Sequence, residues 1–467
     1  MNFSDSENKD PSESQGAGPD PERPVSQLPS QQTPLAAGYG HDPYAALRFR
    51  DYRLYVASGT IGVIGSQIQS VALGWEIYVR TDSTMALGWI GLARAIPVLL
   101  LALPAGQAAD WFDRKSIILV SQVLSIFSAL CLLALSVYQG PLTTHHDGFI
   151  HLMYGCIFLR SMFATFGQPA RTSLLPQVVP SSAFANAITW NSSTFHMALV
   201  VGPVIGGFII ATSLPLAYCA DAICILIAFI LTLFLRCRPV ERSTEAATLK
   251  GLAAGFRFVF RTKVLLATLT LDMLAVLSGS TTALLPIFAK DILKVGVEGL
   301  GWMRAAAAAG SCAMALLLAH LPPMKHAGRT LLWMVAGFGA ATVAFGLSES
   351  FWISMSMLFL TGAFDNVSVV VRGTLVQVLS PNALRGRISA VNNMFISASN
   401  QLGELESGWV AGCFTPVFSA VSGGIGSILV VAMVAVIWPE VRRIGALHEI
   451  KADPSDEDSD KSKEPVQ

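Results

Sequence analysis

Long apolar segments recur along this 467-residue chain, and they constrain its fold more than any other feature. Twelve of them approach 20 residues, the length that an α-helix needs to cross the hydrocarbon core of a bilayer. They cover residues 55–79, 85–108, 116–138, 149–172, 185–212, 215–236, 264–289, 299–320, 329–347, 351–373, 387–413 and 415–438. Only 13% of the residues are charged, about half the share of a soluble domain. We therefore expect an all-α membrane protein with twelve transmembrane helices and exclude a soluble multidomain enzyme.

Basic residues are distributed unevenly between the two sets of loops that connect these segments. If both termini are cytoplasmic, twenty lysines and arginines lie at the inner ends of the spans, against three (Arg80, Lys290 and Lys294) on the outer side. This asymmetry follows the positive-inside rule and requires an even number of spans. We expect a multi-pass protein of the inner membrane with both termini in the cytoplasm. The net charge of zero gives no indication of a nucleic-acid partner.

Composition divides the chain into five regions. Residues 1–46 and 440–467 are polar and poor in large apolar side chains, so we expect disordered cytoplasmic tails, the second one acidic. Residues 47–236 and 264–439 each hold six apolar segments and should form two six-helix bundles. The cytoplasmic linker 237–263 alternates apolar and basic residues, which predicts a short amphipathic helix on the membrane surface.

An internal repeat supports the division into two halves. A shift of the sequence by 201 residues aligns residue types that hydrophobicity alone does not match. The aligned pairs are Arg171 with Arg372, Pro180 with Pro381, Asn191 with Asn392, Gly202 with Gly403 and Gly207 with Gly408. Pseudo-symmetric halves of this kind are typical of transporters, with the substrate held between them near the midplane.

The loop between the second and third spans carries a motif of small and charged residues, Gly106-Gln-Ala-Ala-Asp110-Trp-Phe-Asp113-Arg114-Lys115. It resembles the loop signature of the major facilitator superfamily, in which the acidic residue helps to latch the outward-open state. The resemblance implies this role for Asp110. A glycine at 106 permits close helix approach, and the basic pair suits an anionic membrane surface. Asp113 stands where the family often has glycine, and a plain turn with a charge cluster is the alternative.

The fifth span contains Gly202-Pro203-Val-Ile-Gly206-Gly207, which resembles the antiporter signature of the same superfamily, associated with exporters. Proline bends a helix and small residues allow close packing, so a generic packing face is the alternative. Residues 166–176, 385–393 and 403–408 resemble the enterobactin-exporter and macrolide-efflux branch. These resemblances together imply the major facilitator fold and transport out of the cell.

Charged residues inside the spans are the candidates for substrate binding or proton coupling, because a charge in hydrocarbon costs at least a few kcal/mol and usually lines a cavity. They are Arg94, Arg160, His196, Asp272, Asp365, Glu404 and Glu406. In the family that the chain resembles, an arginine near the position of Arg160 is tied to proton coupling, although Ala164 replaces the glycine that usually follows it.

Each candidate acid has an alternative role as a structural charge paired with Arg94 or Arg160. Glu404 and Glu406 are two residues apart on a helix, so at most one of them should face a cavity. We expect Glu76 and Arg304, near span ends, to reach the membrane surface instead.

The sequence carries no phosphate-binding loop, zinc-binding helix or paired cysteine motif, and we expect neither an enzyme nor a bound cofactor or metal. The function predicted is that of a secondary active transporter, driven by the proton gradient, that exports a small amphipathic molecule such as a drug or a siderophore-like metabolite. The alternatives are a lysophospholipid carrier, an importer of the same fold, or a non-transporting receptor or scaffold. The sequence does not indicate an oligomeric state.

Overall fold

The computed structural model describes residues 42–138, 146–237, 249–322, 324–381 and 384–445. These residues form helices, turns and short connections without a strand, which confirms the predicted all-α class. Most of the two predicted tails and much of the predicted linker lie outside the described ranges.

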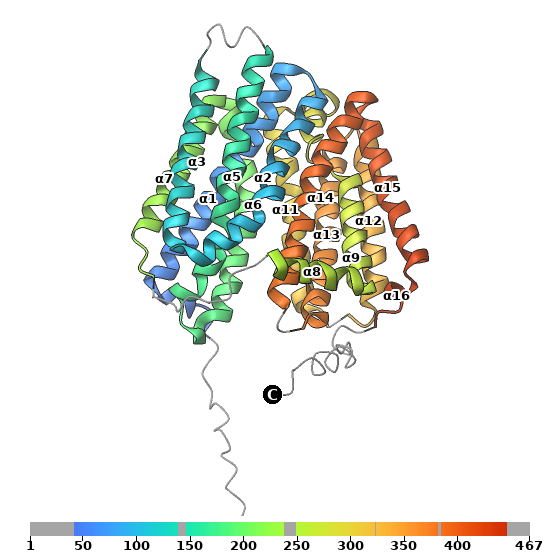
Figure 1. Ribbon diagram of the computed structural model, residues 1–467. Coiled ribbons are helices and arrows are strands. Elements are labelled where there is room, and N and C mark those ends of the chain that lie inside the picture. The colour runs from blue at the N-terminus through green and yellow to red at the C-terminus, as the bar shows by residue number, and fades with distance from the viewer. Residues whose placement is uncertain (1–41, 139–145, 238–248, 323, 382–383, 446–467) are drawn as a thin grey trace, which may run out of the picture. The chain divides into compact units, whose positions relative to one another are not determined.

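Six long helices make up the first half of the membrane domain (Figure 1). They are α1 (Arg50–Thr81), α2 (Thr84–Trp111), α3 (Arg114–Val137), α5 (His146–Val178), α6 (Phe184–Thr212) and α7 (Leu214–Leu233). Two single turns precede α1 and α6, namely η1 (Ala46–Arg48) and η2 (Ser181–Ala183).

The second half also has six long helices, preceded by a separate helix α8 (Leu249–Arg261). The six are α9 (Lys263–Gly279), α11 (Gly296–His320), α12 (Ala327–Leu347), α13 (Phe351–Leu379), α14 (Arg385–Cys413) and α15 (Pro416–Ile437). Short pieces complete this half: α10 (Leu285–Ile287), the π-helical η3 (Phe288–Ile292) and α16 (Pro439–Arg442).

Ten helices in the described ranges are long and apolar enough to cross a membrane, and the number rises to eleven if α8 and α9, bent by 97° at their junction, are taken as one span. The eleventh predicted span, α14, is a continuous helix but too polar to qualify, since it includes Glu404, Glu406 and several amide and hydroxyl side chains. The seventh is shorter than expected, because α9 ends at Gly279 and the chain continues irregularly to α10.

Capping side chains fix where several helices begin. The side chain of Asp113 accepts a hydrogen bond of 2.8 Å from the backbone N–H of Ser116 and so starts α3. Thr415 caps α15 in the same way, and Pro416 occupies the first turn, where a missing N–H costs nothing. These caps place the turns between the spans.

Packed structure extends into both regions that the sequence assigned to tails. Ala46 is fully buried and its N–H donates to Oδ1 of Asn186 at 3.0 Å. At the other end of the described chain, Val441 of α16 is buried and the carbonyl of Gly445 accepts a hydrogen bond from the N–H of Ala327 at 3.2 Å. Apolar contacts outweigh the polar composition of these short stretches.

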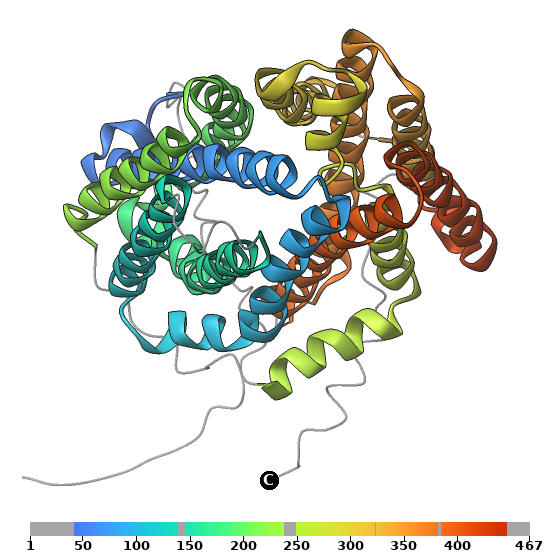
Figure 2. The ribbon, with the colours of Figure 1, turned by 90° about the horizontal axis from the view of Figure 1, so that it is seen from above.

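The two halves meet mainly through two helix pairs, α2 with α14 and α6 with α11, and α1 also contacts α10 and α11. We call the end of the helices at which α1 joins α2 the far end, and the end at which α8 and α16 lie the tail end (Figure 1). Figure 2 shows the two groups of helices side by side when viewed along the helices.

Glycines that the sequence repeat aligned occupy equivalent positions at these contacts. Gly408 of α14 is so close to α2 that a Cβ added to it would lie 2.6 Å from the Cα of Gly88. On the other side, a Cβ on Gly207 of α6 would lie 3.2 Å from the Cα of Gly301 in α11. Both contacts lie near the far end, and each needs a residue without a side chain.

Within the first half, a buried ion pair ties α5 to α7. Arg160 donates from Nη1 and Nη2 to the two carboxylate oxygens of Asp221, at 2.7 and 3.0 Å. The side chain of Asp221 is completely buried. Both groups belong to one half, which is the geometry expected of a structural ion pair, the alternative to proton coupling.

We expect Asp221→Asn to destabilise the protein by about 3 kcal/mol, because it leaves the Arg160 guanidinium in a buried site without its carboxylate. The double variant Arg160→Gln with Asp221→Asn replaces the ion pair by neutral amides and should recover most of the loss. Thermal unfolding in detergent measures both. A double variant less stable than Asp221→Asn alone would contradict a mainly structural pair.

Candidate functional site

Three charged side chains from both halves surround Ser70 of α1. Arg304 of α11 donates from Nη1 to Oγ of Ser70 at 2.8 Å, and Arg94 of α2 donates from Nη2 to the same oxygen at 3.2 Å. Nη1 of Arg94 also lies 3.8 Å from Oε2 of Glu404 on α14. We call these four residues the cross-half cluster, because they join two helices of each half.

The cross-half cluster lies well inside the helices. Each of its residues is separated from the far end of its helix by eight to eleven residues, which at 1.5 Å per residue is roughly 12–17 Å. That depth is about half the thickness of the hydrocarbon core, which is approximately 30 Å. The four residues line one small pocket, whose other walls include Leu87, Ile90 and Pro286. A polar pocket between two halves near the midplane is where transporters of this architecture hold substrate.

The charges of the cross-half cluster do not balance. Two guanidinium groups face one carboxylate, and Nε of Arg304 is buried without a hydrogen-bond partner among the described atoms. A buried donor without a partner is costly, so a ligand acceptor at this position would be favoured. Arginine also presents a planar fork that binds carboxylates and similar anionic groups through two parallel hydrogen bonds.

The expectation that Arg304 and Glu76 reach the membrane surface is wrong. Arg304 points to Ser70 across the interface between the halves. Glu76 is 1% exposed and accepts hydrogen bonds from the hydroxyl of Tyr218 at 2.5 Å and from Nε of Arg80 at 2.9 Å. A count of helical turns would have found Arg304, since two full turns separate it from the start of α11.

A second set of cross-half contacts closes the far end. Lys290 of η3 forms an ion pair with Asp82, which follows α1, and its ammonium lies 4.9 Å from the ring centroid of Tyr78. The hydroxyl of Tyr78 donates to the carboxylate of Asp291. Asp82 itself adopts a left-handed conformation at φ 46°, which turns the chain between α1 and α2. These contacts lie on the far-end side of the cross-half cluster.

Two of the predicted acids lie together inside the second half. Asp272 of α9 forms an ion pair with Arg372 of α13, and both are almost completely buried. Asp365, two turns before Arg372 on α13, lines the same small pocket as Asp272. It forms no hydrogen bond or ion pair with any residue in the described ranges. This pocket therefore contains one paired acid and one acid whose side chain has no partner among the described residues.

The remaining in-span candidates lie apart from the cross-half cluster. His196 of α6 is half-buried and meets the ring of Phe195 edge-on, with centroids 5.8 Å apart. Glu406 accepts a hydrogen bond from Oγ of Ser407 at 3.3 Å and does not line the pocket that contains Glu404. Of the two glutamates on α14, one faces this pocket.

The loop motif between α2 and α3 is mainly structural in this conformation. Arg114 donates to the carbonyl of Ser173 at 2.8 Å, and Lys115 donates to two carbonyls at the end of α7. Asp113 is the cap of α3 described above, and Asp110 is half-buried with no hydrogen bond or ion pair to a described residue. Nothing lies within 4 Å of a Cβ built on Gly106, so the expected close helix approach there is wrong.

The Gly-Pro motif of α6 forms a packing face on two sides. Gly202 and Gly206 lie against α1, where a Cβ on Gly206 would be 3.1 Å from the Cα of Ile68. Gly207 faces α11, as described, and the carbonyl of Pro203 would lie 2.6 Å from a Cβ on Gly301. The motif therefore builds one of the two contacts between the halves, which is consistent with either of its predicted roles.

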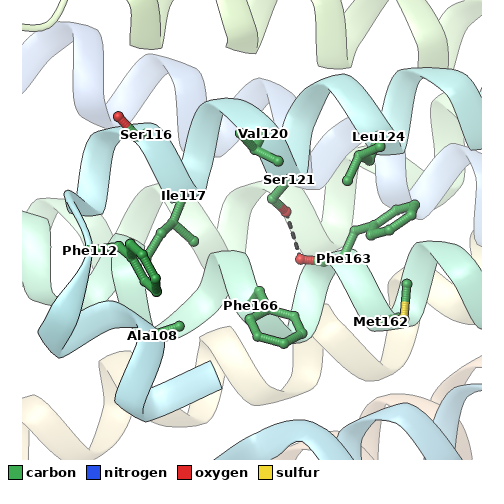
Figure 3. Close-up of a pocket in the computed structure, with 10 residues that line it drawn as sticks. All are labelled: Ala108, Phe112, Ser116, Ile117, Val120, Ser121, Leu124, Met162, Phe163 and Phe166. Carbon is green, nitrogen blue, oxygen red and sulfur yellow. Dashed lines mark hydrogen bonds between the residues drawn. The ribbon is translucent and has the colours of Figure 1, made fainter. Parts of the chain in front are cut away.

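An apolar pocket of about 440 Å³ lies within the first half, between the end of α2, α3 and α5 (Figure 3). Phe112, Phe163 and Phe166 line it, and Oγ of Ser121 donates to the carbonyl of Phe163 at 2.6 Å. None of its lining residues is charged or belongs to the second half. The pocket therefore lacks the polar groups and the position between the halves that distinguish the cross-half cluster.

Comparison with known proteins agrees with this architecture. Residues 41–464 match the family described as transmembrane secretion effector. The enterobactin exporter EntS of Shigella boydii serotype 18 is 25% identical over 399 residues, which cover 84% of this chain and 92% of that protein. The same protein from Escherichia coli O127:H6 matches equally.

Solved structures of transporters share the fold. A D-xylose–proton symporter superposes with a TM-score of 0.64 at 13% identity, covering 85% of this chain and 98% of its own. The nucleoside transporter NupG superposes with a TM-score of 0.61 at 14% identity, covering 86% and 100%. The chain belongs to the transmembrane secretion effector family of the major facilitator superfamily and is a multi-pass membrane transporter of that type.

Proposed function

We propose that this transporter exports a small amphipathic molecule in exchange for protons, by alternating access of the cross-half cluster to the two sides of the membrane. The observation that carries the proposal is the position of Arg94, Arg304 and Glu404 between the halves, roughly midway through the helices. The similarity to an enterobactin exporter supports transport out of the cell. With both termini cytoplasmic, the closed far end is the outer one.

The cross-half cluster suits a substrate that carries both acceptor and donor groups. An anionic or strongly accepting group would bind the guanidinium groups of Arg94 and Arg304, and a neighbouring hydroxyl or amine would donate to the carboxylate of Glu404. The apolar part of the substrate would contact the aliphatic side chains that surround the pocket. Such a molecule is amphipathic.

Exchange follows if the substrate and a proton compete for Glu404. The ionised carboxylate accepts hydrogen bonds from the substrate, whereas the protonated group loses acceptor capacity and no longer attracts Arg94. Binding of a proton from the outer side would therefore release the substrate there. The change also weakens a contact between α2 and α14, which links protonation to movement of the halves.

Glu404→Gln tests this coupling, because glutamine keeps the size of the side chain and cannot titrate. In vesicles with an imposed proton gradient, we expect the rate of gradient-driven export to fall at least tenfold in the variant. Exchange of substrate that needs no energy source should persist. Glu406→Gln is the matched control, two residues along the same helix, and should keep the dependence on the gradient.

Gradient-driven export by Glu404→Gln at the rate of the unmodified protein would contradict the assignment. If Asp365→Asn removed the coupling in that case, the titrating acid would be the unpaired one in the second half. Export by the unmodified protein that continues undiminished after collapse of the gradient would overturn proton coupling altogether.

A latch role for Asp110 makes a separate prediction. In this conformation Asp110 has no partner in the described ranges, as expected if it engages the second half only when the tail end closes. Asp110→Asn should then lower the export rate several-fold with little change in the unfolding temperature. Asp113→Ala should instead lower stability, by about 1 kcal/mol, because it removes the side-chain cap of α3. An unchanged rate for Asp110→Asn at equal expression would contradict the latch.

A further inference from the structure

A pocket at the tail end of the second half has no role in the proposed transport mechanism. It lies between the start of α12, the end of α15 and the short α16, three elements that pack against one another. Its volume is about 590 Å³. It shares no lining residue with the pocket of the cross-half cluster.

Three arginines surround the mouth of this pocket. Arg329 lies in the first turn of α12, and Arg442 and Arg443 lie at the end of α16. All three are exposed, and none of the three guanidinium groups has a hydrogen bond or ion pair with a residue in the described ranges. The nearby carboxylate of Glu440 is directed to Lys263, 3.7 Å away. Among the residues that the structure describes, nothing therefore balances the positive charge at the mouth.

The deeper part of the pocket is apolar. Trp333, one turn beyond Arg329, is 74% exposed, and Val431 and Ala435 of α15 form the opposite wall. Ala336 lies seven residues from Arg329, or roughly 10 Å further along the helix. The pocket is positively charged at its mouth and apolar toward the middle of the helices. A phospholipid has the matching arrangement, with a charged headgroup at one end, glycerol next and acyl chains beyond. An exposed tryptophan near the ends of spans is typical of the membrane interface.

We propose that this pocket binds an anionic phospholipid of the leaflet at the tail end. The phosphate would bind the three guanidinium groups, which present planar pairs of donors, and an acyl chain would lie along Trp333 and the wall formed by α15. Basic pockets between transmembrane helices at the cytoplasmic surface recognise acidic lipid headgroups through this chemistry. Since the N–H of Ala327, the first residue of α12, donates to the carbonyl of Gly445 just after α16, the lipid would stabilise the end of the second half.

The test is native mass spectrometry of the full-length protein in detergent, titrated with phosphatidylglycerol or with phosphatidylcholine of the same acyl chains. We expect phosphatidylglycerol to bind at least tenfold more tightly. The double variant Arg442→Gln with Arg443→Gln should weaken that binding about 30-fold, on the basis of about 1 kcal/mol for each basic residue at a membrane surface. The charge-matched control is Arg50→Gln with Arg53→Gln, two exposed arginines at the tail end of α1, and should bind as the unmodified protein does.

Two further variants separate this lipid from other occupants. Ala435→Trp fills the apolar wall without changing the charge, and we expect it to weaken lipid binding at least fivefold. A chain that ends at residue 445 lacks the acidic segment beyond α16 and should bind the lipid unchanged. Equal affinity for both lipids, or for glycerol 3-phosphate and phosphatidylglycerol, would overturn the proposal. So would lipid binding that appears only after removal of residues 446–467, because the acidic segment would then be the occupant.

Discussion

Close backbone contact between the two halves is the constraint on which the rest of the structure depends. Gly88 with Gly408, and Gly207 with Gly301, bring α2 to α14 and α6 to α11 near the far end. Side chains at these positions would separate the helices. The proximity that the glycines allow places the guanidinium of Arg94 and the carboxylate of Glu404, from different halves, within 3.8 Å of each other. Packing of small residues therefore sets the electrostatics of the candidate site.

Buried charges in this protein divide into two kinds. Arg160 with Asp221, and Asp272 with Arg372, are pairs within one half, and they hold neighbouring helices together whichever way the halves move. The cross-half cluster differs, because its members separate when the halves move apart. A charge that gains or loses a proton there changes the energy of one conformation relative to the other, whereas a charge within a half does not. Substitution of Glu404 therefore tests most directly whether proton uptake is coupled to movement of the halves.

Much of the fold follows from the sequence, because length, hydropathy and repeats are local properties. The apolar segments predicted the positions of the long helices, and the aligned pairs Gly202–Gly403 and Gly207–Gly408 occupy equivalent contacts in the two halves. The exception is α14, which is too polar to qualify as a span and whose Glu404 faces the polar pocket between the halves.

The partners of the charged residues could not be predicted in the same way. Arg160 and Asp221 are 61 residues apart and Arg304 and Ser70 are 234 apart, so their contacts depend on helix rotation and packing. The sequence places Arg304 near the end of a span but does not give the direction of its side chain, so it does not predict that Arg304 belongs to the cross-half cluster. For Gly106 the motif predicts a close helix contact that the structure does not contain, because no neighbouring atom lies within 4 Å of a Cβ built there.

The most direct test of the central claim, that the halves move about the cross-half cluster as it takes up a proton, is a pair of distance measurements by electron paramagnetic resonance. Spin labels at Thr212 and Phe414 report on the far end, and labels at Thr172 and Gln377 report on the tail end, in a background without native cysteines. As the pH is lowered, the far-end distance should increase while the tail-end distance decreases, and Glu404→Gln should abolish both responses to pH. Distances that stay constant, or that change in the same direction at both ends, would contradict the account.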